Sequence, residues 1–247
     1  DNPFPERTAE ITAEDIAVIR GHRLVFLKVN PIQYNPVTKK TVAFQRIEVR
    51  INFSEPAQIR GVSMRIRSAE FEKLLESSVL NYKDQNRFYA EEMTEEADQP
   101  EKLPGCDYLI ITHQDFYTAG DSNNSINQLA NWKRQKGLTT RIEIVSAISS
   151  AANSDDISND IRNYIQNAYN HWYPVPTYIL IVGDVDRVPT NDGSNHNGHR
   201  TLPNAAGVRF PTPVGTDLYY ATVDPDPKTG NSDYFPDIYV GRISADA

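Results

Sequence analysis

The residues best suited to covalent chemistry are the single cysteine, Cys106, and His113, which is close to it in sequence. A cysteine nucleophile needs a base within hydrogen-bonding reach and a group that orients that base. His113 lies two residues before Asp115, so it could be a general base held by a carboxylate. The apolar run 108–112 separates Cys106 from His113 and, as a strand, would put them at its opposite ends. We therefore expect Cys106 to be a small buried residue, and no convincing nucleophile accompanies His113.

Two other pairs could bind a cation. Asp184 and Asp186 follow the apolar run 178–182, where paired carboxylates suit a metal or a cationic substrate. A turn in which Asp184 accepts backbone N–H bonds explains the same residues, and we favour it. His196 and His199 are three residues apart in a segment rich in Gly and Asn, a spacing that suits a metal only if other ligands converge on it. A solvated loop is the simpler interpretation of that pair.

A third candidate lies near the C-terminus, in the sequence DPDPKTGNSD. Asp224, Asp226 and Asp233 offer oxygen ligands at close spacing in a turn containing Pro and Gly, as calcium favours. The spacing argues against it, because Lys228 and Thr229 occupy the fifth and sixth positions of the twelve-residue calcium loop. A calcium site and an ordinary turn both remain open.

Composition excludes several classes of function. The 247 residues include 33 acidic and 25 basic side chains, and the net charge of -8 disfavours a nucleic-acid partner. No apolar run approaches the ~20 residues of a membrane span. The segment IVGDVD has one glycine where a phosphate cradle needs several, so nucleotide binding has little support.

The elements that would position these residues alternate between strand and helix after residue 105. Apolar strands are expected at residues 108–112, 141–145 and 178–182. A helix capped by Asp121 or Ser122 and stopped by Gly137 fills the first interval, and a helix capped by Ser154 or Asp155 fills the second. This order predicts a parallel sheet with a helix on each face and ligand sites beyond the carboxyl ends of its strands. His113, Ser146 and Asp184 follow those ends.

The first 90 residues predict an antiparallel β domain. Apolar and polar side chains alternate from Ile47 to Phe53, and residues 24–29 predict another strand. Residues 35–38 supply turn chemistry before a strand that starts near Thr41. Ser68 predicts the start of an amphipathic helix that ends near Tyr82. Its apolar stripe comprises Phe71, Leu74, Leu75, Ser78, Val79 and Tyr82.

An acidic segment divides the chain. Six Asp and Glu residues crowd positions 91–101, and Pro100, Pro104 and Gly105 follow or interrupt them. Such a segment repels itself and buries little, which is typical of a linker. We expect a β-rich domain at 1–90, a linker at 91–105 and an α/β subdomain at 106–247.

The order of the segments resembles that of the gingipain-type cysteine peptidases. DYLIITHQDF, NWKRQKGLTT, ILIVGDVDRVP, TDLYY and DYFPDIYVGRIS together are similar to the amino-terminal subdomain of that family. Upstream, VFLKVNPIQYNPVTKKTVAFQRIEVRINF and the helix FEKLLESSVLNY are similar to the family's propeptide. The resemblance implies a β-rich propeptide-like domain followed by a mostly parallel, caspase-like α/β subdomain.

The resemblance also implies a function. It implies a secreted endopeptidase that cleaves protein or peptide substrates with a cysteine thiolate and a histidine base, requires no cofactor, and is kept inactive by its propeptide. The family's catalytic pair follows the VGR segment in a downstream subdomain, which would be the partner of this chain. No residue here can therefore be assigned as catalytic, and we expect the chain alone to be inactive. Calcium is compatible with this interpretation.

Propeptides of this family often place a basic side chain in the specificity pocket. Arg87 and Lys102, on either side of the acidic stretch, are the basic residues nearest the expected processing point. Either could mark an inhibitory or cleaved position, and an ordinary solvated cation is the simpler interpretation of each. The alternative to a peptidase is a non-enzymatic module that binds protein or carbohydrate at the carboxyl edge of the sheet.

Overall fold

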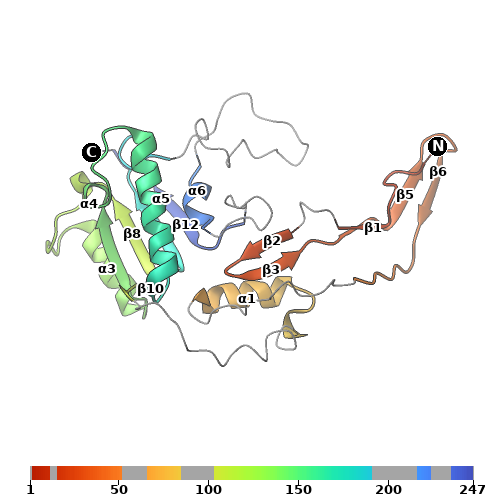
Figure 1. The fold of residues 1–247 in the computed structure, drawn as a ribbon, viewed down its shortest axis with the longest axis horizontal. Helices are drawn as coiled ribbons and strands as arrows, with labels where there is room; N and C mark the ends of the chain where they lie inside the picture. Colours follow the sequence, from red (N-terminus) through yellow and green to blue (C-terminus); the bar gives the residue numbers. More distant parts are fainter. Residues whose placement is uncertain are drawn as a thin grey trace.

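The computed structural model describes residues 2–11, 16–51, 66–84, 103–190, 216–223 and 235–246. The described residues between 2 and 84, the N-terminal segment, form β-hairpins and a ten-residue helix, and those between 103 and 246 form an α/β subdomain (Figure 1). A hairpin arm of the N-terminal segment extends away from the rest of the molecule (Figure 1). In the described parts of the chain, no helix is both long and apolar enough to cross a bilayer.

The subdomain is built on a parallel sheet of four strands, which confirms the predicted parallel α/β architecture. The strands are β8 (Tyr108–Thr112), β9 (Thr140–Ile144), β11 (Tyr178–Val182) and β12 (Tyr239–Ile243), in the spatial order β12-β11-β8-β9. The first and third match their predicted bounds, because a continuous apolar run bounded by polar residues leaves little choice of register.

Helices cover both faces of the sheet. On one face α5 (Ser154–His171) packs Ile161 and Ile165 in a core with Leu109 and Ile111 of β8. On the other, α3 (Ser125–Gln135) packs Ile126 and Ala130 with Tyr108 and Ile110 of the same strand. Successive residues of β8 thus alternate between the two cores, which is the expected behaviour of a strand buried on both faces.

The predicted helix caps are displaced by a few residues. Asn124, rather than Asp121 or Ser122, caps α3 by accepting hydrogen bonds from the backbone N–H groups of Ile126 and Asn127. Asn153 caps α5 in the same way. Gly137 lies just past α3 with φ 86°, so the predicted glycine stop is confirmed. A four-residue helix, α4 (Val145–Ile148), follows β9 and was not predicted.

The described residues of the N-terminal segment form three antiparallel strand pairs. They are β1 (Ala9–Glu10) with β4 (Lys28–Val29), β2 (Ile16–Ile19) with β3 (His22–Val25), and β5 (Ile32–Asn35) with β6 (Lys40–Ala43). Asn35 accepts hydrogen bonds from the N–H groups of Val37 and Thr38, which confirms the predicted turn. The single strand predicted at 24–29 is divided between β3 and β4. The strand predicted from Ile47 is wrong for residues 47–51, and residues 52 and 53 lie outside the described residues.

The predicted helix of this segment is α1 (Ala69–Ser78), which ends earlier than expected and is followed by a 3-10 turn (Tyr82–Asp84). Phe71 and Leu75 are its buried residues, whereas Leu74 is 41% exposed. Ser68 occupies the N-cap position but makes no side-chain capping bond, because its Oγ instead accepts a hydrogen bond from Thr177 in the subdomain.

The remaining elements are short. They are β7 (Leu103–Pro104), which pairs in parallel with β10 (Trp172–Tyr173), a 3-10 turn at Gln114–Phe116, and α6 (Leu218–Ala221). The pairing of β7 means that the last residues of the predicted linker already contact the subdomain.

Candidate functional site

The carboxyl edge of the sheet is the natural place for a site. The chain leaves β8 toward β9 on one side, whereas β11 and β12 lie on the other, so the strand order reverses between β8 and β11. Ligands of open α/β sheets bind in the crevice at such a point. Thr112, the last residue of β8, is fully buried and donates from Oγ1 to the carbonyl of Val182 at 3.2 Å, which ties the two strand ends together.

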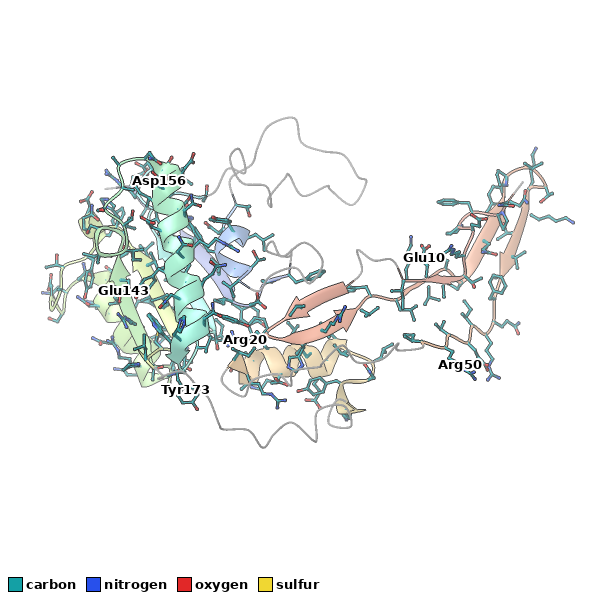
Figure 2. The ribbon with its side chains drawn as sticks, viewed as in Figure 1. Glu10, Arg20, Arg50, Glu143, Asp156 and Tyr173 are labelled. Atoms are coloured by element: carbon teal, nitrogen blue, oxygen red, sulfur yellow. The ribbon has the colours of Figure 1, made fainter. Side chains whose placement is uncertain are left out.

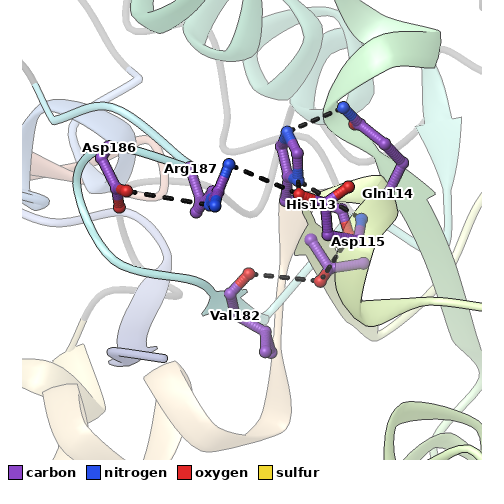
Figure 3. Close-up of polar contacts among 7 residues, drawn as sticks. His113, Gln114, Asp115, Val182, Asp186 and Arg187 are labelled. Carbon is purple, nitrogen blue, oxygen red and sulfur yellow. Dashed lines mark hydrogen bonds and ion pairs between the residues drawn. The ribbon is translucent and has the colours of Figure 1, made fainter. Parts of the chain in front are cut away.

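His113 and its neighbours form a connected polar group at this edge (Figure 3). His113 Nδ1 lies 3.1 Å from Asp115 Oδ2, and its Nε2 lies 2.7 Å from Gln114 Nε2. The backbone N–H of Asp115 also donates to His113 Nδ1, at 3.3 Å. Arg187, from the turn after β11, reaches Asp115 Oδ2 at 3.4 Å.

This arrangement holds the His113 ring in place and does not leave it available as a general base. A general base must offer a ring nitrogen to the substrate, and both nitrogens of His113 already face a protein partner. Its side chain is only 15% exposed. The predicted proximity of His113 and Asp115 is confirmed, and the contact of Arg187 with Asp115 links this group to the turn after β11.

Cys106 has the buried environment that we expected. It is 1% exposed and precedes β8, so the length of that strand separates it from His113. Burial raises the pKa of the thiol to about 12, and Arg141 offsets only part of this effect. A thiol with this pKa is protonated at neutral pH and is a poor nucleophile.

Asp246, after β12, adds a third carboxylate to the pair that follows β11, which the sequence did not reveal. Carboxylate oxygens of Asp184, Asp186 and Asp246 lie within 4.8 Å of one another. The turn itself is closed by the main-chain carbonyl of Asp184, which accepts from the N–H groups of Arg187 and Val188 at 2.9 and 2.8 Å. The predicted turn is therefore present, although a carbonyl rather than a side chain closes it. Carboxylates clustered on a surface are common without an ion, and we assign none here.

Arg242 connects three of the segments on which the family resemblance rests. This side chain of the VGR segment makes two parallel bonds with the carboxylate of Asp217 in TDLYY, at 2.8 and 2.7 Å. Its Nη1 also donates to the carbonyls of Gly183 and Val188, at 2.8 and 2.9 Å. Sequence reasoning noted each segment but missed this junction, because an Arg and an Asp 25 residues apart carry no local signal.

The N-terminal segment contacts the opposite, amino-terminal edge of the sheet. Phe71 of α1 stacks on Tyr239 at the start of β12, with 4.4 Å between ring centroids. Thr177, just before β11, donates from Oγ1 to Ser68 Oγ at 3.1 Å in a buried contact. Ile66 lies in the same buried core as α5. The two parts of the molecule therefore share a packed interface.

The other predicted site residues lie outside the described part of the chain: Arg87, Lys102, His196, His199, Asp224, Asp226 and Asp233.

Comparison with known proteins identifies two family profiles that match this chain. The sequence profile of the propeptide of family C25 matches residues 1–89, and the profile described as peptidase family C25 matches residues 101–247. The two matched ranges adjoin the acidic segment from either side. They confirm the resemblance to gingipain-type cysteine peptidases that the motif order indicated.

Named relatives are similar along the whole chain. Gingipain R2 of Porphyromonas gingivalis is 24% identical over 249 residues, which cover 100% of this chain and 28% of that protein. Lys-gingipain of the same organism is 24% identical over 238 residues, which cover 94% and 11% of the two chains. The crystal structure of the Arg-specific cysteine proteinase gingipain R superposes with a TM-score of 0.40 at 20% identity, covering 61% of this chain and 27% of that one. The chain thus spans between about a tenth and little more than a quarter of the length of these relatives. With the C25 profile matched over more than half of its residues, the chain belongs to peptidase family C25.

Proposed function

We propose that this chain is part of a secreted cysteine endopeptidase that is made as an inactive zymogen, with the N-terminal segment as its propeptide. The observation that carries the proposal is the succession of the propeptide and peptidase profiles along one chain. Protein or peptide substrates follow from the same family membership.

We further propose that the catalytic cysteine and histidine belong to a downstream subdomain that packs against the α/β subdomain. The environments of this chain's own candidates support that division. Cys106 is buried and protonated, and both ring nitrogens of His113 are engaged. The α/β subdomain then serves as the scaffold on which the active site is completed. Calcium binding at Asp224, Asp226 and Asp233 stays a prediction, and the proposed chemistry requires no cofactor.

The proposal is tested by comparing this chain with the polypeptide that continues beyond Ala247. The chain alone should show no thiol-dependent hydrolysis of peptide substrates, whereas the longer, processed protein should show hydrolysis that thiol alkylation abolishes. Cys106→Ala should leave the activity of the longer protein within about twofold of the parent, because the thiol lies outside the site. A peptidase rate from the chain alone that Cys106→Ala abolishes would contradict the assignment.

The longer, processed protein also tests the hypothesis that the chain is cleaved next to Arg87 or Lys102. N-terminal sequencing of the mature protein should find a new terminus between residues 87 and 105, next to Arg87 or Lys102 if either is the cleaved position. Maturation far from this interval would reject both residues.

The non-enzymatic binding module makes the opposite prediction for the longer protein. It would bind protein or carbohydrate without hydrolysis, and alkylation would change nothing. The profile matches favour the peptidase.

A further inference from the structure

Arg20 occupies an unusual backbone position at the tip of the β2–β3 hairpin. The two-residue turn that joins the strands consists of Arg20, with φ 47°, and Gly21, with φ 78°. Two positive φ values are typical of the type I′ turn, whose first central position favours Asn, Asp or Gly. An arginine in this conformation is strained, because its Cβ lies too close to the carbonyl oxygen that follows. Such strain persists where the surroundings compensate for it.

The side chain of Arg20 supplies that compensation. It is 1% exposed and lies where the hairpin meets the α/β subdomain (Figure 2). Its Nε donates to the carbonyl of Ile66 at 2.5 Å, and its Nη1 donates to the carbonyls of Pro176 and Asp237 at 3.0 and 2.9 Å. The rings of Phe71 and Tyr169 lie 5.2 and 5.5 Å from the guanidinium carbon, within the range of cation–π contacts.

Asp237 completes the contact from the subdomain side. It is fully buried, and its Oδ1 accepts a hydrogen bond from the backbone N–H of Arg20 at 2.8 Å. Its Oδ2 accepts from the N–H of Val223 at 3.1 Å, so the carboxylate links the hairpin tip to the chain after α6. We call Arg20 with Ile66, Phe71, Pro176, Tyr169 and Asp237 the Arg20 socket.

The socket lies at the amino ends of two strands. Pro176 is two residues before β11 and Asp237 two residues before β12, whereas the His113 group follows the carboxyl end of β8. A five-residue parallel strand spans about 16 Å, so this length separates the two edges. Arg20 therefore holds the N-terminal segment on the side of the sheet away from the His113 group.

We propose that Arg20 is the docking residue through which the N-terminal segment recognises the α/β subdomain, and that this socket keeps the two parts associated after the chain between them is cut. The proposal rests on the proposed propeptide function. The planar guanidinium of Arg20 donates to three main-chain carbonyls, a geometry that a lysine ammonium does not reproduce. The carbonyls of Pro176 and Asp237 belong to the α/β subdomain, and that of Ile66 belongs to the N-terminal segment. Docking strength therefore depends on Arg at position 20, and not on positive charge alone.

The test uses the whole chain with a recognition sequence for a site-specific protease inserted between Glu95 and Glu96, in the acidic segment between the two matched profiles. After cutting, the dissociation constant of the two pieces is measured by dilution and size-exclusion chromatography. Arg20→Lys should weaken association roughly 10- to 100-fold, which corresponds to losing one or two charged hydrogen bonds. The matched control is Arg23→Lys, on the same hairpin, whose side chain is exposed and which should change association less than about twofold.

Equal association of the Arg20→Lys and parent pieces would overturn the proposal, as would separation of the parent pieces at micromolar concentration. A second measurement needs no variant. In the uncut parent chain the N–H of Arg20, which donates to buried Asp237, should exchange with solvent as slowly as the core amides of β11. Exchange at the rate of unstructured chain would refute the docking contact. Both readouts concern association only, so they stay distinct from any failure to find peptidase activity in the longer protein.

Discussion

Among single residues, Arg242 shows how contacts between segments distant in sequence determine the structure of the carboxyl edge of the sheet. Its guanidinium holds Asp217, 25 residues away, and Gly183, 59 residues away. Each of these segments could be recognised in the sequence as a motif, but their spacing along the chain does not predict that they contact one another. The location of His113 was easier to predict from the sequence, because it directly follows an apolar strand. Its contact with Asp115 was also predictable, because the two residues are only two positions apart. The contact of Arg20 was the hardest to predict, since its partner Asp237 is 217 residues away in the sequence.

Replacing Arg242 by lysine tests whether this junction stabilises the fold. The ammonium can keep one contact with Asp217 but not the paired bonds or the two carbonyl contacts. We expect the free energy of unfolding to fall by about 2 kcal/mol, because these bonds are charged and largely shielded from solvent. Urea denaturation measures the change. Arg46→Lys is the control, since the side chain of Arg46 is 83% exposed in its pair with Glu48 and the same substitution there should cost less than about 0.5 kcal/mol. Similar losses for both variants would refute the role of the junction.

Cys106 makes the free energy of unfolding of the chain fall as the pH rises through the alkaline range. The thiol titrates near ~8.5 in the unfolded chain, whereas burial raises its pKa to about 12 in the native state. Between these values the unfolded state has lost the proton that the native state keeps, so the free energy of unfolding falls as pH rises. The expected loss between pH 8.5 and 9.5 is about 1.4 kcal/mol at most.

Denaturant unfolding of the parent chain and of Cys106→Ala across this interval measures the effect. The variant should lose less stability than the parent over the same pH range, whatever its stability at pH 7. Above pH 10 both proteins should weaken further, because burial also raises the pKa of Tyr164 and Tyr220. Parallel pH profiles below pH 9.5 would contradict the assignment to Cys106.

At the scale of elements, prediction succeeded where hydrophobic pattern alone decides the structure. β8 and β11 are short apolar runs buried on both faces, and the stripe of α5 is long enough to show its period. α4 has four residues, too few for any period to appear. The alternation from Ile47 indicated a strand, but strands also require a partner, and residues 47–51 pair with none in the described chain.

Gly105 provides a test of the connection between β7 and β8. A Cβ at this position would lie 2.1 Å from the carbonyl oxygen of Pro174 and 2.7 Å from Cβ of Trp172, atoms that cannot move without shifting β10. Gly105→Ala should therefore lower the free energy of unfolding by about 2 kcal/mol or more. Gly241 in β12 is the matched control, because a Cβ there would meet nothing within 4 Å. Gly241→Ala should be neutral or stabilise by ~0.5 kcal/mol. Thermal unfolding of the two variants compares them, and equal melting temperatures would disprove the crowding at Gly105.

At the scale of the whole molecule, the division into a β-rich segment and an α/β subdomain was predictable from composition and from the resemblance. Their mutual arrangement was not, because it depends on buried contacts such as Phe71 on Tyr239 and Thr177 with Ser68. None of these residues differs in type from ordinary core or cap residues, so only the folded structure reveals that they join two domains. The interface lies at the amino edge of the sheet, and among the described residues the N-terminal segment makes these contacts at the edge opposite to the one where we propose that the downstream subdomain packs.

The strand order has a practical consequence for handling the chain. Within the described residues β12 pairs with β11 on one side only, so the amide and carbonyl groups of its outer side have no strand partner in that part of the chain. An open strand of this kind is a template on which a strand from a second molecule can add. Ile243, at its end, is 50% exposed and adds an apolar contact. Concentrated solutions of the isolated chain should therefore self-associate through β12, and any polypeptide that caps this strand should improve its solubility.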